Sequence, residues 1–370
     1  MIYTDQLDNK KIKTNNNVIS ADIIYDVQNG DSGKGKVSSY LSSQLGRSSL
    51  LFGSKNKHYS FVVRWGGGAN AGHTVYVEGK KYKTHIVPSG VFHGVKSLIG
   101  PGCVINLESL KQEFSYLKES GFDTSLVLIS PSAHIVTEAH IENDKKNLAK
   151  KFGTTSKGIA PAYSDKYARV GIRFGDIAKN DPFWKPHLYE GPLYGNILCE
   201  GAQGFYLDIN WGNYPYVTSS ETLPYAACSV GFSPKKINNI YAVAKIYETR
   251  SGEDPDFPET LFDNPELAKI GEIGQEYGVT TGRRRKVNYL NLDRLIFALK
   301  IGGGNNLIIS KCDVLKEAGI YKLFHNNDLL SFDSINLMQE YISERVSDEC
   351  PEVERIYYSS SPEVVEGLFI

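Results

Sequence analysis

The sequence predicts an α/β protein: a single large domain with a central, mainly parallel β-sheet flanked by helices. Short runs rich in β-branched and aromatic residues alternate with segments of helical length. A glycine-rich loop of the phosphate-binding kind follows the first of these runs. With 370 residues, of which 41% are hydrophobic, the chain is long enough to bury the core of such a domain.

The elements of this sheet can be placed along the chain. The expected strands are Ile23–Val27, Phe61–Arg64, Ser125–Ile129, Ile240–Ala244 and Asn306–Ile309. Two polar segments, Arg47–Ser60 and Lys179–Tyr194, have the composition of surface insertions. Residues 1–17 are expected to form a mobile tail and residues 18–370 the domain, in which no repeat is evident.

Bulk composition narrows the class of protein. The 41 basic and 42 acidic side chains nearly cancel, which argues against nucleic acid or a membrane surface as a partner. No run reaches the length of a membrane span, and the polar N-terminus lacks the apolar centre of a signal peptide. The five cysteines are odd in number and widely spaced, so we interpret them as reduced residues that pack in the interior. They are Cys103, Cys199, Cys228, Cys312 and Cys350. We therefore expect a cytoplasmic protein.

The loop Gly30–Lys36 reads Gly-Asp-Ser-Gly-Lys-Gly-Lys after the first expected strand. Its backbone N–H groups can surround a phosphate at the start of a helix. The usual hydroxyl that holds Mg²⁺ is replaced by Val37, while an acid, Asp31, lies inside the loop. Such an acid needs a cation between it and the phosphates, or takes a proton from a second substrate. A helix cap remains the alternative explanation.

Further polar loops follow the expected strands, where ligands of parallel sheets bind. Gly66–Thr74 contains His73, which can donate a proton or simply bond its own turn. Gly153–Gly158 and the basic stretch Lys166–Arg173 offer hydroxyls, amides and a guanidinium for a phosphate monoester, or form a solvated charged face. Side-chain amides and hydroxyls that can contact a purine nucleotide lie in Glu200–Gly204 and Tyr214–Ser220.

Two segments near the C-terminus complete the pattern. Val279–Lys286 carries four consecutive cations after Thr-Thr-Gly, which suits a loop closing over an anionic ligand better than a nucleic-acid patch. Ser310–Asp313 follows the last expected strand. Its aspartate can accept the N1–H and 2-amino hydrogens of guanine while the stem of Lys311 covers the ring, so GTP is favoured over ATP.

These segments, in this order, resemble the adenylosuccinate synthetase family from about Ile23 to Pro362. The strongest matches are Gly33–Lys36, Asn70–Thr74, Ile86–Gly90, Glu200–Gly204, Tyr214–Ser220 and Thr280–Arg285. The resemblance implies GTP-dependent ligation of L-aspartate to C6 of IMP through a 6-phosphoryl intermediate. The N1 proton is removed first, GTP then phosphorylates O6, and the aspartate amine displaces phosphate.

The resemblance also implies roles for individual residues. The implied catalytic residues are Asp31, His73 and Lys34, with Asp31 as the general base and His73 as the general acid. Mg²⁺ is expected on Asp31 and the Gly72 carbonyl. GTP is expected at Gly30, Ser32, Gly33, Gly35, Lys36, Thr74, Arg285, Lys311, Asp313, Ser359 and Ser361. IMP is expected at Asn70, Ala71, Thr155, Arg169, Gln203, Thr218, Ser251 and Arg283. Aspartate is expected at Val279, Thr280, Thr281, Gly282, Arg283 and Arg285. A homodimer is implied, with Arg169 reaching the neighbouring site.

Departures from the family pattern mark the chain as compact and divergent. Ser32 stands where the family usually has glutamate, and Asn29 where it usually has tryptophan. Ser251–Asp256 replaces a short segment near the ribose, and it brings in Glu253 and Asp254. An alternative therefore stays open: the phage-type reaction that joins aspartate to dGMP. A non-catalytic GTP-binding regulator is the remote alternative, disfavoured because Asp31, His73 and Arg285 are retained.

Overall fold

The computed structural model describes residues 17–47, 58–278 and 282–368. Its central feature is an eight-stranded sheet in which every neighbouring pair is parallel. The strand order is β16 (Arg355–Tyr358), β13 (Asn306–Ser310), β10 (Ile237–Lys245), β1 (Asn17–Asp26), β9 (Tyr194–Glu200), β2 (Tyr59–Arg64), β5 (Lys96–Ile99) and β7 (Val127–Ile129). The expected α/β class with a mainly parallel sheet is confirmed.

The central strands are apolar on both faces because helices cover both. In β1, Ile24 packs in a cluster with Val37 of helix α1 (Lys34–Arg47). Its neighbours Ile23 and Tyr25 belong to the opposite cluster, which includes Leu295 of helix α8 (Leu292–Gly302). This two-sided burial explains why the strands read as apolar runs and not as alternating patterns.

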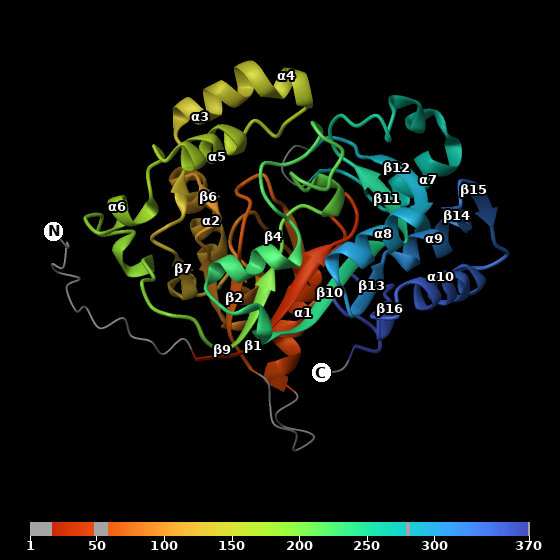
Figure 1. Cartoon of the computed structure of the whole chain (residues 1–370), viewed down its shortest axis with the longest axis horizontal. Helices are drawn as coiled ribbons and strands as arrows, with labels where there is room; N and C mark the ends of the chain where they lie inside the picture. The colour runs from red at the N-terminus through yellow and green to blue at the C-terminus, as the bar shows by residue number, and fades with distance from the viewer. Residues whose placement is uncertain (1–16, 48–57, 279–281, 369–370) are drawn as a thin grey trace, which may run out of the picture.

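Smaller sheets and helices surround this core (Figure 1). A mixed sheet has the order β11 (Tyr247–Arg250), β12 (Lys286–Asn291), β14 (Lys322–His325) and β15 (Asp328–Ser331). Two-stranded sheets pair β3 (His73–Val77) with β4 (Lys80–Thr84) and β6 (Val104–Ile105) with β8 (His134–Ile135). The remaining α-helices are α2 (Leu107–Glu119), α3 (Glu138–Asn143), α4 (Ala149–Phe152), α5 (Ile159–Ala168), α6 (Phe174–Ala178), α7 (Pro265–Ile273), α9 (Cys312–Ala318) and α10 (Ile335–Glu349).

Several short helical turns connect these elements. The 3₁₀ segments are η2 (Ser89–His93), η3 (Thr124–Leu126), η5 (Lys185–His187), η6 (Phe205–Leu207), η7 (Pro224–Val230), η8 (Pro234–Lys236) and η9 (Glu259–Asp263). The π-helical turn η4 (Asp144–Leu148) joins α3 to α4, and π turns are frequent at functional sites. Figure 1 shows α3 and α4 along the upper edge of the view with α5 just below them, and α7, α9 and α10 on the right.

Three boundary predictions need correction. The expected strand Ser125–Ile129 is η3 followed by the short β7, because Asp123 accepts a hydrogen bond from Ser125 N at 2.9 Å and forms a turn. Lys179–Tyr194 is no simple surface insertion, since Trp184 is buried against Phe174. The expected tail ends one residue too late, because residue 17 begins β1. Residues 1–16 of that tail, and residues 48–57 of the segment Arg47–Ser60, lie outside the described ranges.

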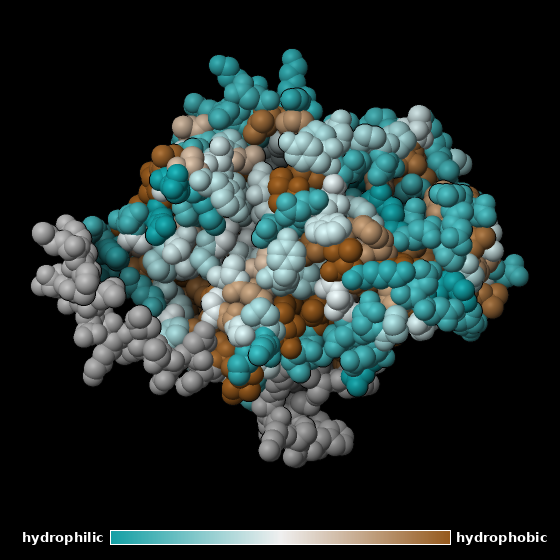
Figure 2. Space-filling model, viewed as in Figure 1, coloured by the Kyte–Doolittle hydropathy of each residue, from teal (hydrophilic) through white to brown (hydrophobic). Residues whose placement is uncertain are grey.

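The face seen in Figure 2 is largely hydrophilic, with hydrophobic residues scattered across it. No helix in the described part of the chain combines the length and apolar character needed to cross a bilayer. All five cysteines carry free thiols, four of them buried and Cys228 half-buried. The expectation that the cysteines are packing residues is consistent with this.

Candidate active site

The turn between β1 and α1 is organised by Asp26, the last residue of β1. Its carboxylate accepts hydrogen bonds from the backbone N–H groups of Gln28, Gly30 and Ser32 at 2.9, 3.3 and 3.0 Å. Lys34 Nζ forms an ion pair with it at 2.9 Å, and both side chains are buried. Gly30 has φ 88°, a left-handed conformation that a larger residue would adopt only with strain. These contacts fix the conformation of the loop.

Lys36 connects this loop to the C-terminal part of the chain. Its Nζ donates to Ser359 Oγ at 2.6 Å and to the Ser361 carbonyl at 2.5 Å. Burial lowers the pKa of Lys36 to about 8. The side chain thus joins two segments that were both predicted to bind GTP, β16 being followed by the turn that contains Ser359.

The histidine of the second glycine loop lies beside the first loop. His73 Nδ1 donates to Glu200 Oε1 at 2.6 Å, while Arg64 NH1 lies 3.1 Å from Nε2. Burial, reinforced by the charge of Arg64, lowers the pKa of His73 to about 4. Burial alone would raise the pKa of Glu200, but the hydrogen bond and charges of His73 and Arg64 lower it to about 2. At neutral pH this is a neutral imidazole bonded to a carboxylate.

Gly35 makes the close approach of His73 possible. A Cβ at Gly35 would lie 2.7 Å from His73 Cβ and 3.1 Å from its Cγ. Gly204 has a similar function on the other side of the loop, where a Cβ would lie 2.5 Å from both Gly30 N and Gln28 O. Three loops that follow β1, β2 and β9 therefore pack against one another without intervening side chains.

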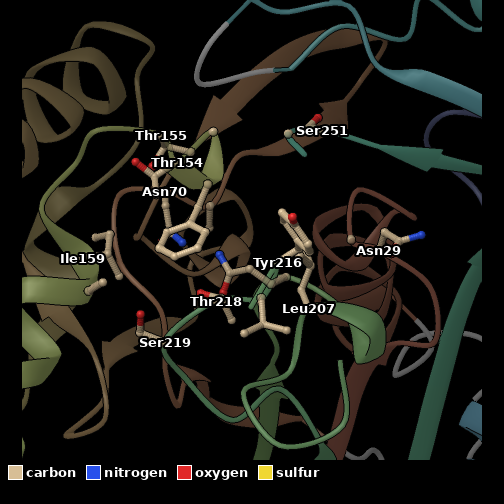
Figure 3. A pocket seen from close by; sticks show the side chains of 18 of the residues that line it. Asn29, Asn70, Thr154, Thr155, Ile159, Leu207, Tyr216, Thr218, Ser219 and Ser251 are labelled. Carbon is tan, nitrogen blue, oxygen red and sulfur yellow. The ribbon is translucent and has the colours of Figure 1, made fainter. Parts of the chain in front are cut away.

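A cavity of about 390 Å³ adjoins these loops (Figure 3). The predicted site residues among those that line it are Gly30, Asp31, Lys34, Asn70, Ala71, Gly72, His73, Thr155, Gln203, Thr218, Ser251 and Arg283. Figure 3 shows Thr154, Thr155 and Asn70 on one side and Asn29 on the other, with Tyr216 and Leu207 between them. The structure thus brings together residues that were predicted separately as catalytic and as binding the purine nucleotide.

Arg169 is the exception among the residues predicted for IMP. It follows α5 in a left-handed conformation with φ 66°, and it is exposed and lies outside the cavity lining. Exposed apolar side chains flank it at Tyr167 (73%) and Val170 (69%). Within this chain, Arg169 therefore does not contribute to the cavity.

The basic segment 282–286 distributes its charges over different partners. Arg283 lines the cavity and donates to the Gly153 carbonyl at 3.3 Å, whereas Arg284 stacks over the Phe262 ring. Gly282 is exposed. The predicted aspartate-binding residues Val279, Thr280 and Thr281 lie outside the described residues.

Arg285 is anchored by two carboxylates. Its NH2 lies 2.9 Å from Asp31 Oδ2, and its NH1 lies 2.5 Å from Glu276 Oε2. Glu276 also pairs with the buried Lys245 at 3.3 Å and accepts from Tyr247 OH at 2.7 Å. Two carboxylates of this chain therefore neutralise the charge of Arg285.

The residues predicted for guanine lie at the carboxyl ends of β13 and β16. Lys311 has φ 67° and donates to the Gly274 carbonyl at 2.9 Å, and Asp313 is exposed in the first turn of α9. Ser359 is buried and Ser361 is half-buried. Thr74 lies apart from them, half-buried on β3.

Sequence reasoning missed several residues that share one signal. Asp26, Arg64, Glu200 and Lys245 are polar, almost fully buried, and the last residues of β1, β2, β9 and β10. A charged residue that ends an apolar parallel strand points to the ligand-binding edge of the sheet. Asp144 was missed as well; its carboxylate accepts from Thr154 Oγ1 at 2.6 Å and from Gly158 N at 2.8 Å, so it holds the loop that contains Thr155.

The donor set fits a Mg²⁺ ion that is shared with a nucleotide. Asp31 offers a carboxylate that is 34% exposed, and Gly72 a backbone carbonyl on the same cavity. Within the described residues, no three His, Cys, Asp or Glu side chains gather into a protein-only metal site. Mg²⁺ commonly binds through one or two carboxylates, with phosphates and waters completing the shell.

The fold and site define a class: a phosphate-loop enzyme with an acceptor cavity at the carboxyl edge of a parallel sheet. A family model for adenylosuccinate synthetase matches residues 23–190 and 193–326. Adenylosuccinate synthetases of Streptococcus gordonii and Streptococcus sanguinis are each 36% identical to the chain, over 361 and 360 residues. Both alignments cover 83% of this chain and 80% of the relative.

Two solved structures are similar. A fully ligated adenylosuccinate synthetase from Plasmodium falciparum has a TM-score of 0.75 at 25% identity, covering 93% of this chain and 98% of that one. A cyanophage S-2L succinoaminodeoxyadenylate synthetase, bound to dGMP and to dATP as an energy donor, has a TM-score of 0.67 at 20% identity over 94% of both chains. The second likeness shows the fold alone.

The chain belongs to the adenylosuccinate synthetase family. It is accordingly a GTP-dependent ligase of purine biosynthesis that forms a carbon–nitrogen bond. The resemblance stated from the sequence is confirmed.

Proposed function

We propose that this ligase joins L-aspartate to C6 of IMP through a 6-phosphoryl intermediate and releases GDP and phosphate. One observation carries the proposal: the acid of the phosphate loop, Asp31, and the histidine of the second glycine loop, His73, line the same cavity as the predicted IMP residues. The streptococcal relatives are named adenylosuccinate synthetase, which supports the same acceptor.

Asp31 is the proposed general base for N1 of the purine. Its carboxylate is partly exposed and pairs with Arg285 at 2.9 Å. This ion pair holds the carboxylate in place at the edge of the cavity. When Arg285 turns towards the carboxylates of bound aspartate, Asp31 is free to bond N1–H and to contact Mg²⁺.

His73 is the proposed acid beside O6, and its surroundings determine when it can act. In the state described here it is neutral, and Nε2 faces the Arg64 guanidinium. A phosphoryl group that arrives near Nε2 would favour the protonated imidazolium. Glu200, bonded to Nδ1, stabilises that cation and fixes the orientation of the ring.

Phosphate binding is assigned to the preformed loop. Backbone N–H groups of Gly30–Lys36 and the ammonium of Lys34 stabilise negative charge on the transferred group. When bound, Mg²⁺ supplies further neutralisation of phosphate charge, and Asp31 with the Gly72 carbonyl are its proposed protein ligands. Lys311 and Asp313 are proposed to hold the guanine base, and Gly282, Arg283 and Arg285 to hold aspartate together with the loop that precedes them.

The proposed assembly is a homodimer. Arg169 is exposed next to Tyr167 and Val170, so a second copy can cover the apolar side chains while the guanidinium reaches the phosphate of the neighbouring site. The free thiols suit a reducing compartment, which supports the cytoplasm as the place of action.

A matrix of acceptors tests the proposal. Purified protein with Mg²⁺ and L-aspartate is incubated with IMP, dIMP, GMP or dGMP, each with GTP or ATP. Formation of adenylosuccinate from IMP with GTP is expected, detected by its absorbance and mass. No product from IMP would refute the assigned acceptor, and turnover of dGMP alone would select the second candidate.

Ligation to dGMP is that second candidate. The structure limits which of the residues that depart from the family pattern could contact the purine of dGMP. Ser32 donates to Gln28 Oε1 at 3.1 Å, and Asp254 accepts from Asn213 at 2.9 Å and pairs with Arg250 at 3.1 Å. Ser32 and Asp254 are thus already engaged with other residues of the chain, which disfavours both as contacts for the purine base. Asn29 is another departure from the family pattern, and it lines the cavity together with Ser251 and Gly252 of the replaced segment.

A further inference from the structure

Asn29 is a buried amide without a partner in the described structure. Its residue is 6% exposed, and neither Nδ2 nor Oδ1 has a hydrogen-bond partner. The adjacent Gln28 is the opposite case, since its amide bonds Ser32, Lys245 and Tyr247. Buried polar groups in folded proteins are nearly always paired, so an orphaned amide that lines a ligand cavity indicates that a ligand completes it.

The position of Asn29 places it at the base end of the cavity. It is separated from Asp31 only by Gly30, where an added Cβ would lie 3.4 Å from the backbone carbon of Gln203. Asn29, Asp31 and Gln203 all line the cavity. Figure 3 shows Asn29 on the opposite side from Thr154 and Thr155, where the phosphate is proposed to bind.

The chemistry of the purine edge then limits what Asn29 can contact. N1 lies between C6 and C2 in the purine ring. Because His73 is proposed to lie beside O6, the substituent at C2 is the position left for another side chain that neighbours the proposed N1 base. IMP carries only a C–H bond there, whereas GMP and dGMP carry an amino group with two donors. Asn29 Oδ1 and Gln203 Oε1 are both buried acceptors without a partner. A 2-amino group can satisfy at least one of them, and IMP leaves both without that donor.

We infer that Asn29 reads the C2 position of the acceptor purine and that its amide oxygen admits 2-amino-6-oxopurine monophosphates as substrates beside IMP. The inference rests on the proposed function of the cavity. It assigns to one residue the discrimination between the two acceptors. A site that hydrogen-bonds an amino group of a ligand discriminates against analogues that lack it, because its own polar group is then left unpaired.

Binding measurements test this without requiring turnover. Dissociation constants for dGMP and IMP are measured by calorimetry with Mg²⁺ and a non-hydrolysable GTP analogue, which fills the guanine pocket. The variants are Asn29→Leu, of similar volume, and Asn29→Ala in case the first does not fold. Asn180→Leu, the same exchange at an exposed position, is the matched control.

We expect Asn29→Leu and Asn29→Ala to weaken dGMP binding at least tenfold and IMP binding less than threefold, with Asn180→Leu unchanged for both. Equal weakening of both purines would show a merely structural role and overturn the inference, as would no weakening or an unmodified chain that does not bind dGMP. Turnover of IMP by the unmodified chain is assayed separately. Its absence would refute the proposed function while the ratio of dissociation constants still decides the role of Asn29.

Discussion

At the scale of single residues, the site depends on carboxylates that are paired with a cation or a hydrogen-bond donor in places where water is excluded. Asp26 with Lys34 and Glu200 with His73 are both buried pairs. Removing one partner of such a pair leaves an uncompensated polar group, which typically costs about 3–5 kcal/mol for a buried ion pair. Asp31 differs because it is partly exposed and its partner, Arg285, has a second carboxylate in Glu276. Asp31 can therefore exchange partners without unfolding the loop.

Asp31→Asn is the direct test of the proposed base. An amide cannot accept the N1 proton, and positioned proton transfer typically contributes about 10²–10⁴-fold to rate. We expect kcat for ligation to fall by at least about 100-fold, while GTP binding, measured by calorimetry, weakens far less because the loop N–H groups remain. Undiminished turnover would contradict the role, and loss of GTP binding together with the fold would show a structural one.

His73 predicts how stability depends on pH. Its folded pKa of about 4 lies below the ordinary 6.5, so the unfolded chain binds this proton first. The free energy of unfolding must therefore fall as pH drops from 6.5 towards 4, by at most about 1.4 kcal/mol per pH unit from this group. Glu200, with a pKa of about 2 against an ordinary 4.5, extends the loss to lower pH.

Urea unfolding of His73→Asn at pH 7.5, 6, 5 and 4 measures this effect. The slope between pH 6.5 and 4 should be shallower than in the unmodified chain. The exposed His58→Asn serves as the control and should leave the slope unchanged. Equal slopes in all three proteins would mean that His73 is not held neutral by its surroundings.

At the scale of elements, the site is a set of loops that leave the sheet at one edge. β1, β2, β9 and β10 end on Asp26, Arg64, Glu200 and Lys245, and the helix α1 starts within the first loop. These loops touch because glycine occupies the points of closest approach. The tightest such contact on α1 is at Gly35, where an added Cβ would lie only 2.7 Å from His73 Cβ.

Gly35→Ala tests whether this contact matters for catalysis. Alanine favours a helix over glycine by roughly 0.5–1 kcal/mol, so α1 itself should tolerate it. The added methyl group must displace His73 from Glu200, and we expect kcat to fall at least tenfold while the melting temperature changes by only a few degrees. Ser43→Ala, on the same helix but away from His73, should retain full activity. Full activity in Gly35→Ala would show that the imidazole position is not critical.

At the scale of the whole molecule, one chain does not place all the predicted residues in its own cavity. Arg169 is exposed on the surface beside Tyr167 and Val170, whereas Asp31 lines the cavity. If the active unit is a homodimer with shared sites, defects at these two positions fall in different sites of a mixed dimer. The geometry of the assembly can therefore be tested by activity alone.

Complementation provides that test. Arg169→Leu and Asp31→Asn are each expected to be nearly inactive. After mixing and subunit exchange in equal amounts, half of the dimers are heterodimers with one intact site, so about a quarter of the unmodified activity should return. A double variant that carries both changes in one chain, mixed with itself, is the control. No recovery despite confirmed exchange would exclude a site completed by Arg169 of a second copy.

The sequence by itself determined the chemistry and the class. The apolar runs between segments of helical length predicted the parallel sheet, and the order of six motifs identified the family. The resemblance then implied most of the predicted site residues that line the cavity. Residues far apart in the sequence meet there because loops after parallel strands converge at one edge. The tertiary structure alone decided the partners: His73 with Glu200, Asp31 with Arg285, and Asn29 with none in the described residues. Which side chains become partners depends on the order of the strands in the sheet and on which side chains are buried away from water. The spacing of residues along the sequence does not reveal either of these.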